Sequence, residues 1–264
     1  MPSRFIGQVY ETEQGLFCLH PSDLGVSGAI VNHGKYDKPL LGFLIRYLKS
    51  TDKMLLLGAH IGALVVPLSK HLDSMTVLEA NPSTYELLKI NLHLNGCTNV
   101  TALNLAANDQ FTNLTFVLNT VNSGGSKRWP ETQDPMYFYD NPEIVMVCAV
   151  PLDDLLVGKY FDIIFMDIEG SETSAMQGMQ ILLGQARILV SEFIPHHLKL
   201  VAGVTPEQFL SGLSGFGVMY SPAVNRWVSD ASIREFIRYL YENDISDGNL
   251  IFFRNAAVAQ DFHP

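Results

Sequence analysis

The sequence predicts an α/β protein whose mostly parallel sheet is covered by helices on both faces. Short apolar runs, at residues 53–57 and 161–167, are typical of strands buried on both faces. Segments with apolar residues at three- and four-residue steps follow such runs, which is typical of amphipathic helices. The alternation of the two patterns indicates βαβ units and therefore a parallel sheet.

The first half of the chain supports this order element by element. Ser83 to Asn95 is the best-marked helix, because Ser83 and Glu86 match a capping box and Gly96 suits a left-handed C-terminal cap. The expected order is loops and short strands over 1–35, a helix over 36–50, a strand over 53–57, a helix over 61–71, a strand over 75–79, the Ser83–Asn95 helix, and strands near 100–105 and 114–118.

The second half begins with a long loop, residues 119–143, rich in Asn, Ser, Gly, Pro and aromatic residues. Loops of this length in a compact domain are usually functional or mobile. Thr205, Pro206 and Gln208 mark a helix start. The expected elements are strands over 144–150 and 161–167, a helix from Glu172 to Leu183, a strand over 187–193, the helix after Thr205, a strand pair within 216–228, a helix over 231–242 and a strand over 249–253.

Composition excludes several functional classes. The formal net charge of −10 opposes nucleic-acid binding, and the pair Lys127–Arg128 is interpreted as a solvated loop. The three cysteines are far apart and form no CxxC pair, so we expect neither a disulfide framework nor a zinc site. We see no signal peptide and no apolar run long enough to span a membrane, and we expect a cytoplasmic protein.

Polar residues gather where three predicted strands end. The first strand runs into Gly58-Ala59-His60-Ile61-Gly62, a turn whose glycines let a ligand approach the main chain. The second ends at Glu79, whose carboxylate can accept hydrogen bonds from the vicinal hydroxyls of an adenosine ribose. The third ends at Asp167. Since ligands of parallel sheets bind at the carboxyl ends of the strands, these groups should face one crevice.

Acids and histidines crowd the last two strand ends. Asp167, Glu169 and Glu172 lie within six residues, and such acids repel one another unless they share a cation, a proton or a donor. Glu172 alone also fits a first-turn helix acid. Glu192, His196 and His197 follow the next strand. Histidine is the usual general base, and carboxylates with histidine can hold a divalent cation.

These segments together resemble the FkbM-type S-adenosylmethionine-dependent methyltransferases, over Tyr36 to Glu192. The segments that carry the resemblance are GAHIG at 58–62, EANPSTYELLKINLHLNG at 79–96, LAAND at 105–109, PLDDLL at 151–156, MDIEGSE at 166–172 and LVSEF at 189–193. Three positions depart from the family pattern. Leu56 replaces an Asp that helps to position the donor's amino group, His60 replaces an Asn, and Phe165 replaces a Lys.

The resemblance implies a Rossmann-like fold of seven strands with the last antiparallel, and S-adenosyl-L-methionine as methyl donor. The residues it assigns to the donor, together with their neighbours in the same motifs, are Gly58, Ala59, His60, Gly62, Glu79, Ala80, Asn81, Ala107, Asn108 and Asp167. Analogy with catechol-type methyltransferases, which place acids at these strand ends, also leaves room for Mg²⁺ or another divalent cation, for which we predict Asp167 and Glu192 as ligands.

The predicted reaction is O-methylation of a sugar or another small molecule. Residues 1–50 are expected to form a substrate or lid segment, and residues 51–264 the donor-binding domain with its insertion loop at 119–143. Asp167, Glu192 and His196 are the predicted catalytic residues, and Glu169, Glu172, Trp129 and Tyr137 the predicted acceptor contacts. The alternatives are a non-catalytic binding module and a nicotinamide-dependent oxidoreductase. A homodimer is left open.

Overall fold

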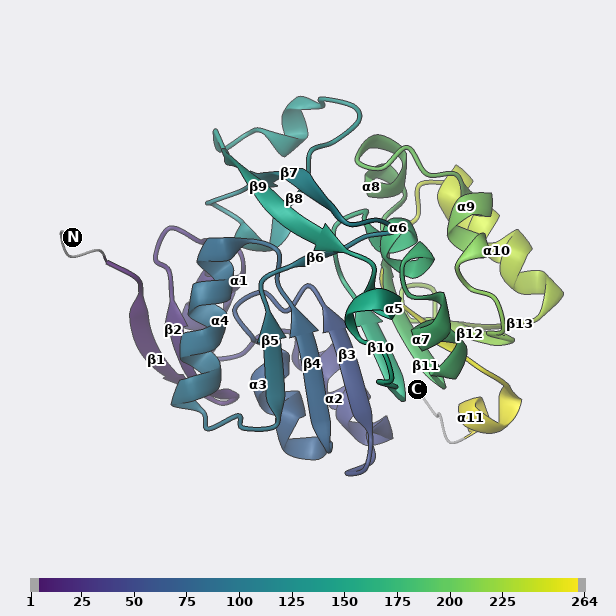
Figure 1. Cartoon of the computed structure of the whole chain (residues 1–264), viewed down its shortest axis with the longest axis horizontal. Coiled ribbons are helices and arrows are strands. Elements are labelled where there is room, and N and C mark those ends of the chain that lie inside the picture. The colour runs from purple at the N-terminus through teal and green to yellow at the C-terminus, as the bar shows by residue number, and fades with distance from the viewer. Residues whose placement is uncertain (1–4, 261–264) are drawn as a thin grey trace.

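The computed structural model describes residues 5–260 and confirms the α/β class, with an eight-stranded main sheet (Figure 1). The predicted segments 1–50 and 51–264 each extend over a terminus, 1–4 and 261–264, outside the described residues. The strands, in their order across the sheet, are β13 (Arg226–Ser229), β12 (Val218–Ser221), β14 (Asp247–Phe253), β11 (Ile188–Phe193), β10 (Ile163–Met166), β3 (Lys53–Leu57), β4 (Ser74–Leu78) and β5 (Val100–Leu103).

The strand directions match the prediction, but the strand count does not. The five strands from β11 to β5 are mutually parallel, and β14 is antiparallel to β11. Seven strands were expected. The eighth arises because β12 and β13 form the antiparallel pair predicted within 216–228, and β13 extends the sheet beyond β12.

The main sheet separates two apolar cores. Leu56 of β3 belongs to one core, whereas its neighbours Leu55 and Leu57 belong to the other. This alternation follows from the period of two along a strand. It explains why the sequence of β3 is apolar at every position from Met54 to Leu57, as expected for a strand covered on both faces.

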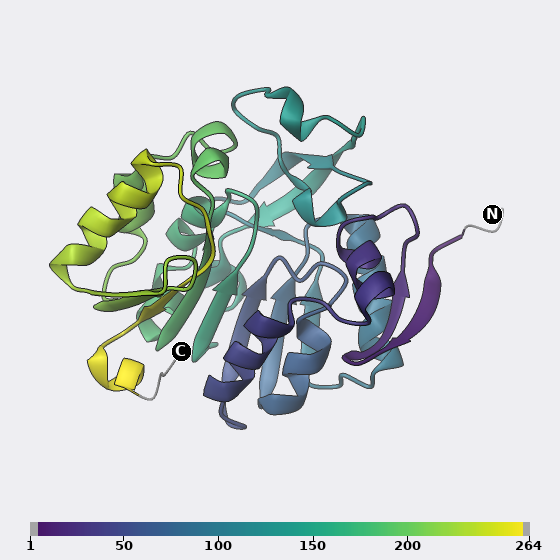
Figure 2. The same ribbon diagram turned by 180° about the vertical axis from the view of Figure 1, so that it is seen from behind.

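Helices cover both faces of the sheet. Figure 2 shows α2 and α3 over one face, and Figure 1 shows α5, α6 and α7 over the other. The helices are α1 (Val26–His33), α2 (Lys38–Tyr47), α3 (Val65–Leu68), α4 (Pro82–Leu94), α5 (Leu152–Leu155), α6 (Glu172–Gln177), α7 (Gln180–Gln185), α8 (Pro195–Leu200), α9 (Pro206–Ser211), α10 (Ala231–Glu242) and α11 (Ala256–Gln260), with single 3₁₀ turns η1 (Ser69–His71), η2 (Ser123–Gly125) and η3 (Pro135–Tyr137).

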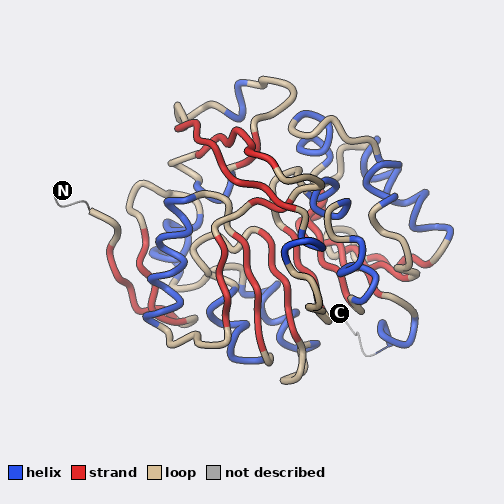
Figure 3. Tube along the Cα trace, viewed as in Figure 1, coloured by secondary structure: helices blue, strands red, loops and turns tan. Residues whose placement is uncertain are grey.

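A second, smaller sheet lies across the carboxyl ends of the main strands (Figures 1 and 3). Its strands, in order, are β6 (Ala106–Ala107), β9 (Glu143–Val150), β7 (Thr112–Leu118) and β8 (Lys127–Arg128). A separate hairpin, β1 (Gln8–Thr12) with β2 (Gly15–Leu19), packs beside α4. The predicted loop 119–143 therefore contains β8, η2 and η3, and β8 is paired with β7.

Two predicted helix boundaries were wrong, and both have a local cause. Asn81, not Ser83, caps α4: its side chain accepts from the backbone N–H groups of Ser83 and Thr84, and Pro82 occupies the first turn. The helix predicted from Glu172 to Leu183 breaks at Gly178, which packs so closely on Asn108 that a β-carbon would lie 2.0 Å from the Asn108 carbonyl oxygen. By contrast, Gly96 has the expected left-handed backbone (φ 62°), and the Thr205 capping box is formed.

Two further observations complete the fold. The helix α1 was not expected, because glycines and histidines are scattered through the sequence up to residue 35. Over residues 5–260, we find no helix with the length and apolar character that crossing a membrane requires.

Candidate functional site

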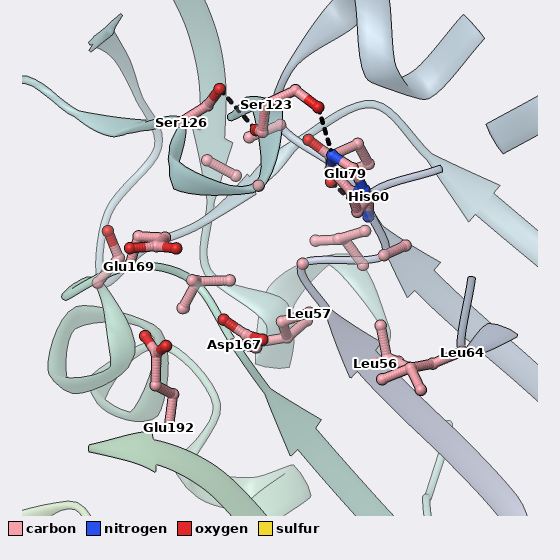
Figure 4. A pocket seen from close by; sticks show the side chains of 18 of the residues that line it. Leu56, Leu57, His60, Leu64, Glu79, Ser123, Ser126, Asp167, Glu169 and Glu192 are labelled. Carbon is pink, nitrogen blue, oxygen red and sulfur yellow. Dashed lines mark hydrogen bonds between the residues drawn. The ribbon is translucent and has the colours of Figure 1, made fainter. Parts of the chain in front are cut away.

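A cavity with a water-accessible volume of about 250 Å³ opens where the ends of β3, β4 and β10 meet the small sheet. The strand ends contribute Gly58, Glu79 and Asp167, and Glu192 comes from β11. The N-terminal segment contributes Val26 and Tyr36, while the insertion loop contributes a run from Asn122 to Gly124 together with Ser126. Figure 4 shows Glu79 and His60 at one end of this cavity, and Glu169 and Glu192 at the other.

Gly58 turns the chain sharply at the end of β3. Its backbone is left-handed (φ 86°), and its N–H donates to the carbonyl oxygen of Leu78 at the end of β4. A β-carbon at Gly58 would lie 1.8 Å from the carbonyl oxygen of Asp167. Only glycine therefore lets the turn approach β10 so closely.

The Glu79 carboxylate is held by two backbone N–H groups. Oε2 accepts from His60 at 2.7 Å and Oε1 accepts from Asn81 at 2.8 Å, so each oxygen keeps one lone pair for a further donor. Burial raises the pKa of Glu79 to about 7 against the opposing effect of these two bonds. Glu79 is thus held in one orientation at the cavity wall, and its two oxygens can each accept a further hydrogen bond.

His60 links the glycine turn to the insertion loop. Its Nε2 lies 2.7 Å from Ser123 Oγ, within hydrogen-bond distance (Figure 4). Asp23, which precedes α1, accepts from the backbone N–H of Ser123 at 3.3 Å and of Ser27 at 2.9 Å. Burial lowers the pKa of His60 to about 4, so the ring is neutral at pH 7. Three segments far apart in sequence therefore meet over the cavity.

The floor of the cavity is apolar apart from one acid. Leu56 and Phe165 both line it and both are almost fully buried. Asp167 lies between Leu56 and the acidic end (Figure 4). Burial first, and the charge of Asp37 second, raise the pKa of Asp167 to about 6. The two positions where the family pattern has a charged residue are thus occupied here by apolar side chains.

Glu169, Glu192 and His197 form a cluster at the opposite end from Glu79. One ligand atom from each can be chosen so that all lie within 4.8 Å of one another. Burial raises the pKa of Glu169 to about 8 and that of Glu192 well above its ordinary value. The pKa of His197 falls to about 3, chiefly through burial. The cluster is therefore a group of desolvated side chains that could share a proton or a cation.

A protein-family profile matches most of this chain. The profile of the Methyltransferase FkbM domain matches residues 57–238, which is well over half of the chain. The chain belongs to the FkbM methyltransferase family. No curated protein sequence matches it.

Solved structures similar to this FkbM-family chain are distant in sequence. An FkbM methyltransferase from Methylobacillus flagellatus KT is 17% identical with a TM-score of 0.47, and the match covers 78% of this chain and 44% of that one. This chain thus spans less than half the length of that protein. M. jannaschii TYW2 in complex with AdoMet is 12% identical with a TM-score of 0.45, covering 96% and 87%. An rRNA methylase from Streptococcus thermophilus is 10% identical with a TM-score of 0.44, covering 81% and 92%.

Most of the predicted donor-binding residues of the FkbM-family chain line the cavity. These are Gly58, Ala59, His60, Glu79, Ala80, Ala107 and Asp167. Three others support the wall from behind. Gly62 packs on Leu88, Asn81 caps α4, and the Asn108 side chain donates to the carbonyl oxygen of Gln110.

Several predictions for the acceptor side need correction. Glu169 lines the cavity, but Glu172 is 1% exposed and accepts from the backbone N–H of Ile168, so it stabilises the start of α6. Tyr137 is 2% exposed, with its ring against His197, and cannot offer a free face to an acceptor. Trp129 packs on Phe138 outside the cavity lining.

The predicted trio of Asp167, Glu192 and His196 is brought together only in part. Glu192 meets Glu169 and His197 instead, because Pro195 begins α8 and the helical turn directs the two histidines differently. His196 packs edge-on against the ring of His197, 4.4 Å away. Asp167, predicted with Glu192 as a cation ligand, does not belong to the group of three side chains whose ligand atoms lie within 4.8 Å of one another.

Sequence reasoning missed Lys127, which was interpreted as part of a solvated loop. Lys127 is 4% exposed, its ammonium lies 5.1 Å from the Tyr137 ring centre and 3.8 Å from Glu169 Oε2, and it donates to the Gly125 carbonyl oxygen. Ser123, Ser126 and Tyr36 were also missed. The excess of acids at 167–172 was the available signal that a buried cation was needed nearby.

Proposed function

We propose that this chain binds S-adenosyl-L-methionine in the cavity and transfers its methyl group to a hydroxyl of a sugar or another small molecule. One observation carries the proposal: the ends of three adjacent parallel strands place Gly58, Glu79 and Asp167 around one cavity. A crevice above the carboxyl ends of parallel strands is where α/β sheets bind nucleoside ligands.

The donor would lie along the Gly58–Glu79 side. The free lone pairs of Glu79 suit the two ribose hydroxyls, and Ala80, Ala106 and Ala107 offer small apolar side chains beside an adenine. Gly58 leaves room for the methionine part of the donor. With Leu56 in place of an acid, the donor's amino group would find its negative partner in Asp167, which lines the same floor.

The acceptor would enter between the N-terminal segment and the insertion loop, which together line the remaining wall. Its hydroxyl oxygen attacks the methyl carbon as the carbon–sulfur bond breaks, and its proton passes to a carboxylate, for which Asp167 and Glu192 are the candidates. A divalent cation would fit this chemistry, because a cation-bound hydroxyl loses its proton more readily.

The net charge of −10 favours a small or saccharide acceptor over a nucleic acid. We also propose that the protein is cytoplasmic and has no membrane partner. Its assembly as a homodimer is left open.

Isothermal titration with S-adenosylhomocysteine tests the donor site. We expect saturable binding at one site per chain, and methylation of hydroxylated acceptors from a donor carrying a labelled methyl group. If the folded wild-type chain binds neither S-adenosylhomocysteine nor the donor, the proposal is wrong and the non-catalytic binding module takes its place. Binding of NADH instead would favour the oxidoreductase.

A further inference from the structure

The acidic end of the cavity contains polar atoms whose bonding is incomplete. Glu192 Oε2 and His197 Nδ1 are both buried and neither makes a hydrogen bond. His197 is only 8% exposed. A buried polar atom without a hydrogen-bond partner destabilises the fold, so two of them in one place need an explanation.

The spacing of these atoms is that of ligands around one ion. His197 Nδ1 lies 3.0 Å from Glu169 Oε2, yet the pair lacks hydrogen-bond alignment. Two ligand atoms that are each roughly 2.1 Å from a metal and at right angles stand about 3.0 Å apart. One ligand atom from each of the three side chains lies within 4.8 Å of the others, so small side-chain adjustments would bring all three to one ion.

The charge balance also calls for a cation. Asp167, Glu172 and Glu169 all act electrostatically on Glu192, and all four carboxyls are buried or half-buried. Lys127 opposes them with a single positive charge. Its ammonium forms an ion pair with Glu169, 3.8 Å from Oε2, and donates to the Gly125 carbonyl oxygen. One lysine charge therefore faces four acids, and when these acids are ionised the excess negative charge favours the binding of a further cation.

We propose that Glu169, Glu192 and His197 bind one divalent transition-metal cation at the acidic end of the cavity. Two carboxylates with one imidazole form a mixed oxygen and nitrogen set, which suits ions from Mn²⁺ to Zn²⁺ better than Mg²⁺ or Ca²⁺. This set keeps Glu192 from the pair predicted from sequence and has Glu169 and His197 in place of Asp167. Glu169 and Glu192 also line the cavity, so open positions on the ion would face an acceptor hydroxyl. That last role rests on the proposed function, whereas the binding of the ion does not.

Titration of the metal-free chain with Mn²⁺, Zn²⁺ and Mg²⁺ tests the site, with calorimetry for all three ions and electron paramagnetic resonance for Mn²⁺. We expect one equivalent of Mn²⁺ or Zn²⁺ to bind, and Mg²⁺ to bind at least about tenfold more weakly. Glu192→Gln should weaken Mn²⁺ binding at least about tenfold and remove the rise in unfolding temperature that Mn²⁺ gives the wild type.

The neighbouring histidines provide a matched pair of variants. His197→Gln should lose Mn²⁺ binding, whereas His196→Gln, next to it in sequence but outside the ligand set, should keep it. Failure of the wild type to bind Mn²⁺ or Zn²⁺, or an equal loss in the two variants, would overturn the proposal. S-adenosylhomocysteine titration of the same preparations reports the donor site separately, so either proposal can fail alone.

Discussion

The two ends of the cavity contrast in how their carboxylates are bonded, although each end has a buried histidine nitrogen without a hydrogen-bond partner, His60 Nδ1 and His197 Nδ1. At the Gly58 end, both Glu79 oxygens accept backbone N–H groups and His60 Nε2 meets Ser123. At the other end, Glu192 Oε2 and His197 Nδ1 are buried without a hydrogen-bond partner. One end is thus held in place by the backbone around it, while the other has polar atoms available to a ligand.

This contrast indicates that the Glu79 end of the cavity is rigid and that the Glu192 end is able to bind a further ligand. A carboxylate held by two backbone N–H groups is preorganised, so little conformational entropy is lost when a ligand binds to it. A buried cluster with more acids than cations destabilises the protein, and binding of a cation or a proton removes this destabilisation. Substitutions at the first end should therefore lower both stability and donor binding.

The largest effect is expected for Gly58→Ala. The new β-carbon would meet the Asp167 carbonyl oxygen, and the residue would keep a positive φ, so the ends of β3 and β10 must separate. The expected loss in the free energy of unfolding is about 3 kcal/mol or more, together with loss of donor binding.

Urea unfolding and S-adenosylhomocysteine titration measure these two losses. Gly184→Ala is the matched control, because it lies in α7 with open space around its α-carbon and should be neutral or slightly stabilising. Equal stability of the two variants would contradict the close packing at Gly58.

Glu79→Gln should have the next largest effect. In this variant one backbone N–H group would face the amide oxygen and the other would face the amide NH₂ group. The second N–H group would then lose its hydrogen bond. We expect a loss of about 1–3 kcal/mol in the free energy of unfolding and at least about tenfold weaker S-adenosylhomocysteine binding. Calorimetry at pH 8 is the measurement, and unchanged affinity would remove Glu79 from the donor site.

The pH dependence of donor binding separates the roles of this acid. Since the pKa of Glu79 is about 7 in the fold, its carboxylate is present above pH 7 and is protonated below it. Affinity for S-adenosylhomocysteine should therefore fall as the pH drops through 7, and Glu79→Gln should lack that step. The effect on stability has the opposite sign: the raised pKa favours folding below pH 4.5, and this contribution is lost as the pH rises through 7.

The smallest effect is expected for Ser123→Ala, which removes the hydrogen bond to His60 Nε2. The loss should be about 1 kcal/mol in the free energy of unfolding. If the insertion loop covers the donor, S-adenosylhomocysteine should also dissociate faster in stopped-flow measurements. Ser83→Ala is the control, because Ser83 does not provide the side-chain cap of α4.

The sheet and the donor end of the cavity could be predicted because their signals are local. The apolar runs of β3 and β10 and the glycines at 58 and 62 each specify a structure within a few residues. The alternation of strands and helices then determines which strand ends are neighbours. Gly58, Glu79 and Asp167 follow from that order alone.

The acidic end could not be predicted to the same detail, because it depends on contacts between distant segments. The choice between His196 and His197 depends on how α8 is rotated about its axis. Lys127 becomes buried only when β8 pairs with β7, across a loop with no periodic pattern. Tyr137 is likewise buried by its packing on His197.

The alternation along β3 has a consequence for how the strand finds its partners. Because residues on both faces are apolar, a slip by one residue would still bury a leucine on either side, so hydrophobicity barely specifies the register. The register of β3 must therefore be specified by contacts at the ends of the strand. The Lys53 N–H donates to Asp162 at one end, and Gly58 fits against Asp167 at the other. Gly58, which lines the cavity, thus also helps to specify the register of β3 against β10.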